Sequence, residues 1–220
     1  MVTLHYPGLK TLLEAGSYDL VIWDFDGVIV DSEPLHRESY LRMLCARGFT
    51  PRSDFFTGLI GLNEGQIWKL LIAKFDIHDD ASKLRSERIE LFRKDSQRLC
   101  LTWFSLILLE HFRATNARQV ILSSGNQEVT EELLSRLGIK HYFDAISAWT
   151  PDTSESEAKP KVMESLLKTS LRGLVIEDNP TYLRLAQSLG SSTVGVTHSN
   201  NDLIGNDADY VLCIDNDKSF

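Results

Sequence analysis

A short apolar run that ends in two aspartates and a glycine constrains the fold more than any other part of the chain. Residues Leu20–Trp23 form a continuous apolar stretch, typical of a strand buried on both faces in the middle of a parallel sheet. Gly27 allows the chain to turn sharply where that strand ends. Open α/β sheets place their sites at the carboxyl ends of their strands, so Asp24 and Asp26 are predicted to share one site there.

The second half of the chain alternates between short apolar runs and helical patterns. This alternation predicts an α/β fold with a parallel, doubly wound sheet, since parallel strands need crossover helices between them. The predicted helices are 104–112, 127–137, 162–168 and 182–189, and the predicted strands after the first are 119–123, 142–146, 173–176, 192–196 and 210–214. The polar, acidic stretch 150–157 is predicted to be a solvated loop.

A long helical segment separates the first strand from the rest of the predicted sheet. Three stretches in it carry apolar residues at helical spacing, and the first begins near Pro34 and ends at Gly48. The predicted organisation is therefore an α/β core made of residues 1–33 and 100–220, with a small all-helical domain, residues 34–99, inserted after the first strand.

The string Asp24–Glu33 (DFDGVIVDSE) resembles the first signature of the haloacid dehalogenase superfamily. Its second aspartate, Asp26, favours the phosphoryl-transfer branch, which includes the β-phosphoglucomutases and phosphoglycolate phosphatases with a helical cap. The resemblance implies a Rossmann-like core, an aspartyl-phosphate intermediate on Asp24, and general acid and base catalysis by Asp26.

Two further stretches resemble the second and third motifs of that superfamily. In Val120–Asn126, Ser124 matches the motif's hydroxyl residue, and the resemblance implies that Ser124, Gly125 and Asn126 bind the phosphoryl group. The motif lysine is expected ahead of a helix, where both Lys159 and Lys161 are candidates. Lys159 is preferred as the catalytic and phosphoryl-binding lysine, because Val162, Met163 and Leu166 follow it on one helical face.

Two adjacent acids follow another apolar strand, as in the fourth motif of the superfamily. Glu177 and Asp178 end the run that starts at Gly173, and neighbouring carboxylates at such a position repel each other unless a cation binds. Together with Asp24 and Asp26 they provide hard oxygen ligands, which suit Mg²⁺ better than zinc or copper. The sequence therefore predicts a magnesium cofactor.

The favoured function is Mg²⁺-dependent hydrolysis of a small phosphorylated metabolite, such as a sugar phosphate. His36 lies where related cap-bearing enzymes carry a histidine; a substrate contact and an ordinary helix-surface histidine remain equally open. A sugar phosphomutase is the alternative, but Glu64 stands where those mutases carry an arginine, and an acid repels phosphate. A non-catalytic binding module is disfavoured because Asp24 and Asp178 are both present.

Composition narrows the expected partners and compartment. A net charge of -8 argues against a general nucleic-acid or membrane binder, because such partners favour a basic face. Cys45, Cys100 and Cys213 are widely spaced and are expected to be reduced thiols in a cytoplasmic protein. No apolar run approaches the length of a membrane span. A monomer or a homodimer is expected.

Overall fold

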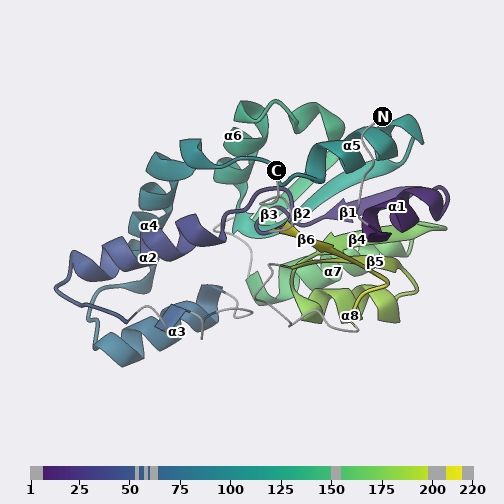
Figure 1. Ribbon diagram of the computed structural model, residues 1–220. Helices are drawn as coiled ribbons and strands as arrows, with labels where there is room; N and C mark the ends of the chain where they lie inside the picture. The colour runs from purple at the N-terminus through teal and green to yellow at the C-terminus, as the bar shows by residue number, and fades with distance from the viewer. Residues whose placement is uncertain are drawn as a thin grey trace. The chain divides into compact units, whose positions relative to one another are not determined.

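The chain folds into two compact units in a computed structural model (Figure 1). One unit combines residues 1–31 with 100–220, and the other is the segment 32–99. The structure describes residues 7–52, 55–56, 59, 64–149, 155–197 and 207–214.

The first unit is built on a six-stranded parallel sheet, which confirms the predicted α/β, doubly wound fold. Its strands run in the order β3-β2-β1-β4-β5-β6. The central strand β1 is fully buried and pairs with β2 on one side and β4 on the other. The strands are β1 (Leu20–Trp23), β2 (Arg118–Asn126), β3 (Ala145–Trp149), β4 (Gly173–Glu177), β5 (Ser192–Thr197) and β6 (Tyr210–Cys213).

Helices cover both faces of this sheet. Its helices are α1 (Pro7–Glu14), α5 (Ser105–Ala114), α6 (Gln127–Arg136), α7 (Glu155–Leu167) and α8 (Pro180–Ser188). Leu20 and Ile22 of β1 pack in one buried cluster with Met163 of α7 and Ala186 of α8. On the opposite face, Trp23 packs edge-to-face against Phe112 of α5, with ring centroids 6.1 Å apart. In Figure 1, α7 and α8 accordingly lie below the sheet and α5 lies above it.

The structure corrects the start of one helix and adds another. Helix α7 begins at Glu155, seven residues earlier than predicted, so Lys159 lies inside the helix instead of ahead of it. The acidic stretch 150–157 was predicted as a loop, yet Glu155 and Glu157 within it, and Ala158 and Lys159 directly after it, are strong helix formers. Residues 150–154 of that predicted loop lie outside the described part of the chain. Helix α1 was not predicted.

The described elements of the second unit are all helical. They are α2 (Glu33–Cys45), α3 (Glu64–Phe75), α4 (Ala81–Asp95) and a short 3₁₀ helix, η2 (Ser96–Arg98). Tyr40, Leu44, Leu71 and Leu84 are among the side chains of its own buried cluster. Residues 60–63 and the side chain of Glu64, which bear on the mutase alternative, lie outside what the structure describes. Among the described helices of both units, none has the length and apolar character that crossing a membrane requires.

Candidate active site

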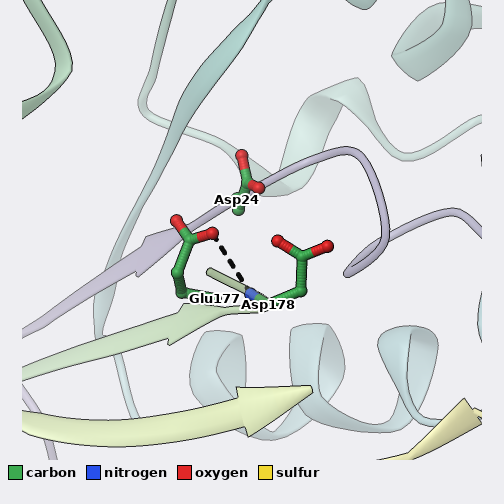
Figure 2. Close-up of side chains that lie close together, drawn as sticks. All are labelled: Asp24, Glu177 and Asp178. Carbon is green, nitrogen blue, oxygen red and sulfur yellow. Dashed lines mark hydrogen bonds between the residues drawn. The ribbon is translucent and has the colours of Figure 1, made fainter. Parts of the chain in front are cut away.

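Three carboxylates meet at the carboxyl edge of the sheet, where β1 and β4 end side by side. Asp24 follows β1, and its backbone N–H donates to the Ile176 carbonyl of β4 across 2.9 Å. Each of Asp24, Glu177 and Asp178 offers a carboxylate oxygen, and these oxygens lie within 4.8 Å of one another. Figure 2 shows the three side chains close together, with Glu177 and Asp178 at the end of β4 and Asp24 beside them where β1 ends.

The face on which each acid lies follows from strand geometry. Side chains alternate along a strand, so Asp24 shares a face with Leu20 and Ile22, and Glu177 shares a face with Val175. Leu20, Ile22 and Val175 all belong to the cluster between the sheet and helices α7 and α8. Asp24 and Glu177 therefore face the same helices.

Burial raises the free energy needed to ionise these acids. Asp24 and Glu177 are 8% and 1% exposed. Burial, followed by the nearby Glu177, raises the pKa of Asp24 to about 8. The same two causes, with Asp24 as a third, raise the pKa of Asp178 well above its usual range. A bound cation would relieve this penalty, so the donor set fits a hard divalent metal.

Lys159 of α7 supplies a buried positive charge to the cluster. Its ammonium lies 3.0 Å from Asp24 Oδ1 and 2.7 Å from Glu177 Oε2, and the side chain is 5% exposed. Burial alone would lower the pKa of this ammonium, but the charges of Asp24 and Glu177 raise it above its ordinary value. When all are ionised, these three acids and one lysine leave two net negative charges, which a divalent cation would balance.

Helical spacing explains why Lys159 and not Lys161 reaches the acids. Residues four apart lie on one face of a helix, so Lys159 shares a stripe with Met163 and Leu167, which pack beneath the sheet. Lys161 lies off that stripe and is exposed. Between the two candidates, the structure brings Lys159 to the acids.

The turn after β1 fits closely against the acid pair of β4. Gly27 has a φ of +73°, and a Cβ added there would lie 2.3 Å from Asp178 Oδ2. The turn is closed by the Gly27 N–H, which donates to the Val30 carbonyl across 2.9 Å. Only glycine combines this backbone conformation with so close an approach.

We expect Gly27→Ala to impair metal binding as well as stability. The strained φ should cost about 1–2 kcal/mol, and the new methyl group should displace the Asp178 carboxylate. Gly138→Ala is a matched control, because Gly138 has a φ of +72° and open space around its Cβ position. Thermal unfolding should show a similar loss in both variants, whereas titration calorimetry should show weakened Mg²⁺ binding only in Gly27→Ala. Equal Mg²⁺ affinity in the two variants would contradict the predicted role of Asp178 as a metal ligand.

Asp26 lies on the same turn and approaches the end of β2. It is half-buried, and its Oδ2 lies 3.0 Å from the position that a Cβ on Gly125 would take. The predicted general acid and the predicted phosphoryl-binding turn are therefore brought together. Asp26 is not part of the group of three carboxylates described above. Its metal contact, which is expected through the backbone carbonyl, stays a prediction.

The hydroxyls at the end of β2 differ in their environment. Ser123 is buried, and its Oγ accepts a hydrogen bond from the Gly125 N–H across 2.9 Å. Ser124 is exposed. Asn126 caps α6, because its Oδ1 accepts from the Val129 N–H across 3.1 Å. The predicted substrate contacts of Ser124, Gly125 and Asn126 stay predictions.

His36 belongs to α2 of the helical unit. Its ring stacks on Phe92 with centroids 4.3 Å apart, and its Nδ1 lies 3.0 Å from Arg88 Nη1. A guanidinium can only donate, so Nδ1 is the acceptor and a neutral His36 carries its proton on Nε2. Its proposed contact with substrate stays a prediction.

Sequence reasoning missed one residue beside the cluster. The ring of Tyr182, on α8, lies 4.5 Å from the Lys159 ammonium. The available signal was the spacing of Tyr182 and Ala186, which places the tyrosine on the buried stripe of the helix that follows the two acids.

Comparisons with known proteins indicate the family of the chain. A family described as haloacid dehalogenase-like hydrolase matches residues 21–196. The chain is 27% identical to a phosphorylated carbohydrates phosphatase from Thermotoga maritima, over 84% of this chain and 88% of that protein. It is 29% identical to a fructose-1-phosphate phosphatase from Escherichia coli, over 60% of this chain and 69% of that protein.

Solved structures share the fold. A β-phosphoglucomutase from Clostridium difficile superposes with a TM-score of 0.69 at 17% identity, covering 88% of this chain and 90% of that one. The protein CbbY from Rhodobacter sphaeroides, in complex with phosphate, superposes with a TM-score of 0.67 at 18% identity, covering 89% of this chain and 93% of that one.

Proposed function

Because the chain belongs to the haloacid dehalogenase-like hydrolases, we propose that it is a Mg²⁺-dependent phosphatase that hydrolyses a small phosphorylated sugar through a covalent intermediate on Asp24. The observation that carries this proposal is the cluster of Asp24, Lys159, Glu177 and Asp178 at the carboxyl edge of the sheet, in which all but Asp178 are buried. The names of the two phosphatases similar to this chain support a phosphorylated carbohydrate as the substrate class.

The first half of the reaction transfers the phosphoryl group to the enzyme. A carboxylate oxygen of Asp24 attacks phosphorus in line, and the bond between phosphorus and the sugar oxygen breaks. Asp26 donates its proton to the departing oxygen, so the sugar leaves as a neutral alcohol. The product is an aspartyl phosphate on Asp24 with Asp26 ionised.

The second half returns the enzyme to its starting state. Asp26, now a carboxylate, takes a proton from a water molecule as that water attacks phosphorus. The bond between phosphorus and Asp24 breaks, inorganic phosphate leaves, and Asp24 is again a carboxylate. Asp26 is then protonated and ready for the next substrate.

The remaining residues hold the transferring group. Lys159 and Ser124 would contact its oxygens, and the backbone N–H groups near Gly125 would add further donors. Asp24, Glu177 and Asp178 would hold the divalent cation, which when bound would neutralise negative charge on the phosphoryl group. All of these groups belong to the α/β unit.

A direct assay tests the proposal. Purified protein should release inorganic phosphate from an aryl phosphate in the presence of Mg²⁺, and excess chelator should abolish the release. A panel of phosphorylated sugars should then rank the substrates. Phosphate release from none of them would refute the phosphatase proposal, and conversion of one sugar phosphate into its isomer would favour the mutase alternative.

We expect Lys159→Met to reduce kcat by about 10²–10³-fold, since loss of one donor to transition-state charge has an effect of this size. The protein should also become less stable, because the buried Asp24 and Glu177 lose their shared positive partner. Lys161→Met is the matched control, since Lys161 is exposed two residues along the same helix. Initial rates and thermal unfolding measure both effects. A larger kcat loss in Lys161→Met than in Lys159→Met would reverse the assignment of the motif lysine.

A further inference from the structure

The ring of Tyr182 lies against the ammonium of Lys159. Lys159 Nζ lies over the ring, 4.5 Å from its centroid, well inside the range of about 6 Å over which a cation is attracted to an aromatic face. Tyr182 is also partly buried and packs against the hydrophobic cluster between the sheet and helices α7 and α8. The ring is therefore held in place independently of the lysine.

The ring adds a third partner to the two carboxylates beside the ammonium. Lys159 meets Asp24 Oδ1 at 3.0 Å and Glu177 Oε2 at 2.7 Å, so the ring is its third close partner. Water is nearly excluded, since the lysine is 5% exposed. A cation over an aromatic ring is attracted more strongly in a desolvated site than at the surface.

The position of the ring is tied to the acids through the start of α8. Asn179 follows Asp178 directly, and its Oδ1 accepts from the Thr181 N–H across 2.9 Å. The Asn179 carbonyl accepts from the Tyr182 N–H across 3.1 Å. The same helix start thus carries Tyr182 and follows the two acids of β4.

We infer that Tyr182 is a positioning residue, which keeps the ammonium of Lys159 beside Asp24 while the charge on Asp24 changes. This inference rests on the proposed function. When Asp24 becomes an acyl phosphate, its carboxylate loses its own charge and Lys159 loses one of its two anionic partners. The attraction of the ring is the same before and after that step, so the ammonium stays in place to contact the phosphoryl oxygens.

Replacing the ring tests the inference. Tyr182→Phe keeps the aromatic face and should retain kcat within about twofold. Tyr182→Leu removes the face and should lower kcat by about 10- to 30-fold, which is the size expected for a desolvated cation–π contact. Tyr142→Leu is a matched control, because Tyr142 contacts Arg113 in the same way, 5.3 Å from the ring centroid, in another part of the α/β unit. Its kcat should be unchanged.

A series that preserves shape separates electrostatics from packing. Phenylalanine analogues with one, two and three ring fluorines at position 182 should lower kcat stepwise, since fluorine withdraws electron density from the ring face. A kcat that stays constant across this series would overturn the inference, whether or not Tyr182→Leu folds. Equal losses in Tyr182→Phe and Tyr182→Leu would overturn it as well.

A stability measurement separates this inference from the proposed function. Urea unfolding of Tyr182→Leu, Lys159→Met and the double variant should reveal coupling. The unfolding equilibrium constant of the double variant should differ by at least about fivefold from the value expected if the two effects were independent. If the wild-type protein releases no phosphate from any substrate, the proposed function fails and the coupling still reports on the contact. If the protein is an active phosphatase and the two substitutions affect unfolding independently, the role of Tyr182 would be overturned while the function would stand.

Discussion

Asp24→Asn should abolish turnover while the protein remains folded. The amide has nearly the shape of the carboxylate but is a poor nucleophile, so kcat should fall by at least about 10⁴-fold. Wild-type protein quenched in acid during turnover should carry one phosphoryl group on the peptide that contains Asp24, as mass spectrometry would show, and the variant should carry none. Asp76→Asn, which changes an exposed aspartate, is the control and should be fully active. Undiminished steady-state activity in Asp24→Asn would refute the covalent mechanism.

The same variant should change the pH dependence of stability in metal-free buffer. Burial and Glu177 raise the pKa of Asp24 to about 8, whereas an unfolded aspartate has a pKa of about 3.9. The folded state therefore binds this proton more tightly, and the stability that it contributes is present below about pH 4 and lost as the pH rises through about 8. The melting temperature of the wild type should thus fall relative to that of Asp24→Asn between about pH 5 and about pH 8. Parallel curves for the two proteins would contradict this expectation.

Asp26→Asn should slow the reaction by roughly 10²–10⁴-fold, the usual contribution of a positioned general acid or base. Asp26 lies on the turn after β1, and its carboxylate approaches Gly125. An amide at this position keeps the shape of the side chain but cannot donate and accept the proton. The loss should be largest for a sugar phosphate, whose leaving oxygen needs a proton. It should be smaller for p-nitrophenyl phosphate, whose leaving group is stable as an anion.

Single-turnover measurements with both substrates check this assignment. With p-nitrophenyl phosphate, the variant should release nitrophenol faster than inorganic phosphate, because breakdown of the intermediate still needs a base. A loss below tenfold with both substrates would remove Asp26 from acid and base catalysis. Ser124→Ala is a useful comparison, since loss of a hydroxyl that binds the phosphoryl group should affect both substrates alike.

The sheet and its acidic edge could be predicted from the sequence because both depend on short-range pattern. An apolar run such as Leu20–Trp23 indicates a buried parallel strand, and residues that follow such a run lie at the carboxyl edge of the sheet. Asp24 and the pair Glu177 and Asp178 were located in this way. The order of the strands then brings β1 beside β4 and the acids within 4.8 Å of one another.

Contacts between distant elements required the tertiary structure. Lys159 meets Asp24 and Glu177 because α7 packs on the face of the sheet to which both acids point, and Tyr182 meets Lys159 because α8 packs beside α7. Helical spacing assigns each of these residues to a face, but it does not say which neighbouring helix that face meets. The close approach of Gly27 to Asp178 is likewise a contact between distant parts of the chain that the sequence pattern does not reveal.

The sequence by itself thus determined the fold class, the edge at which the site lies and the acids in it, since periodicity and turn residues act over a few positions along the chain. The tertiary structure alone decided that Lys159 is buried between two carboxylates and that an aromatic ring lies against it. The physical reason is that these features depend on side chains packing across the sheet and between helices. Such packing brings together residues more than 130 positions apart, as Asp24 and Lys159 are.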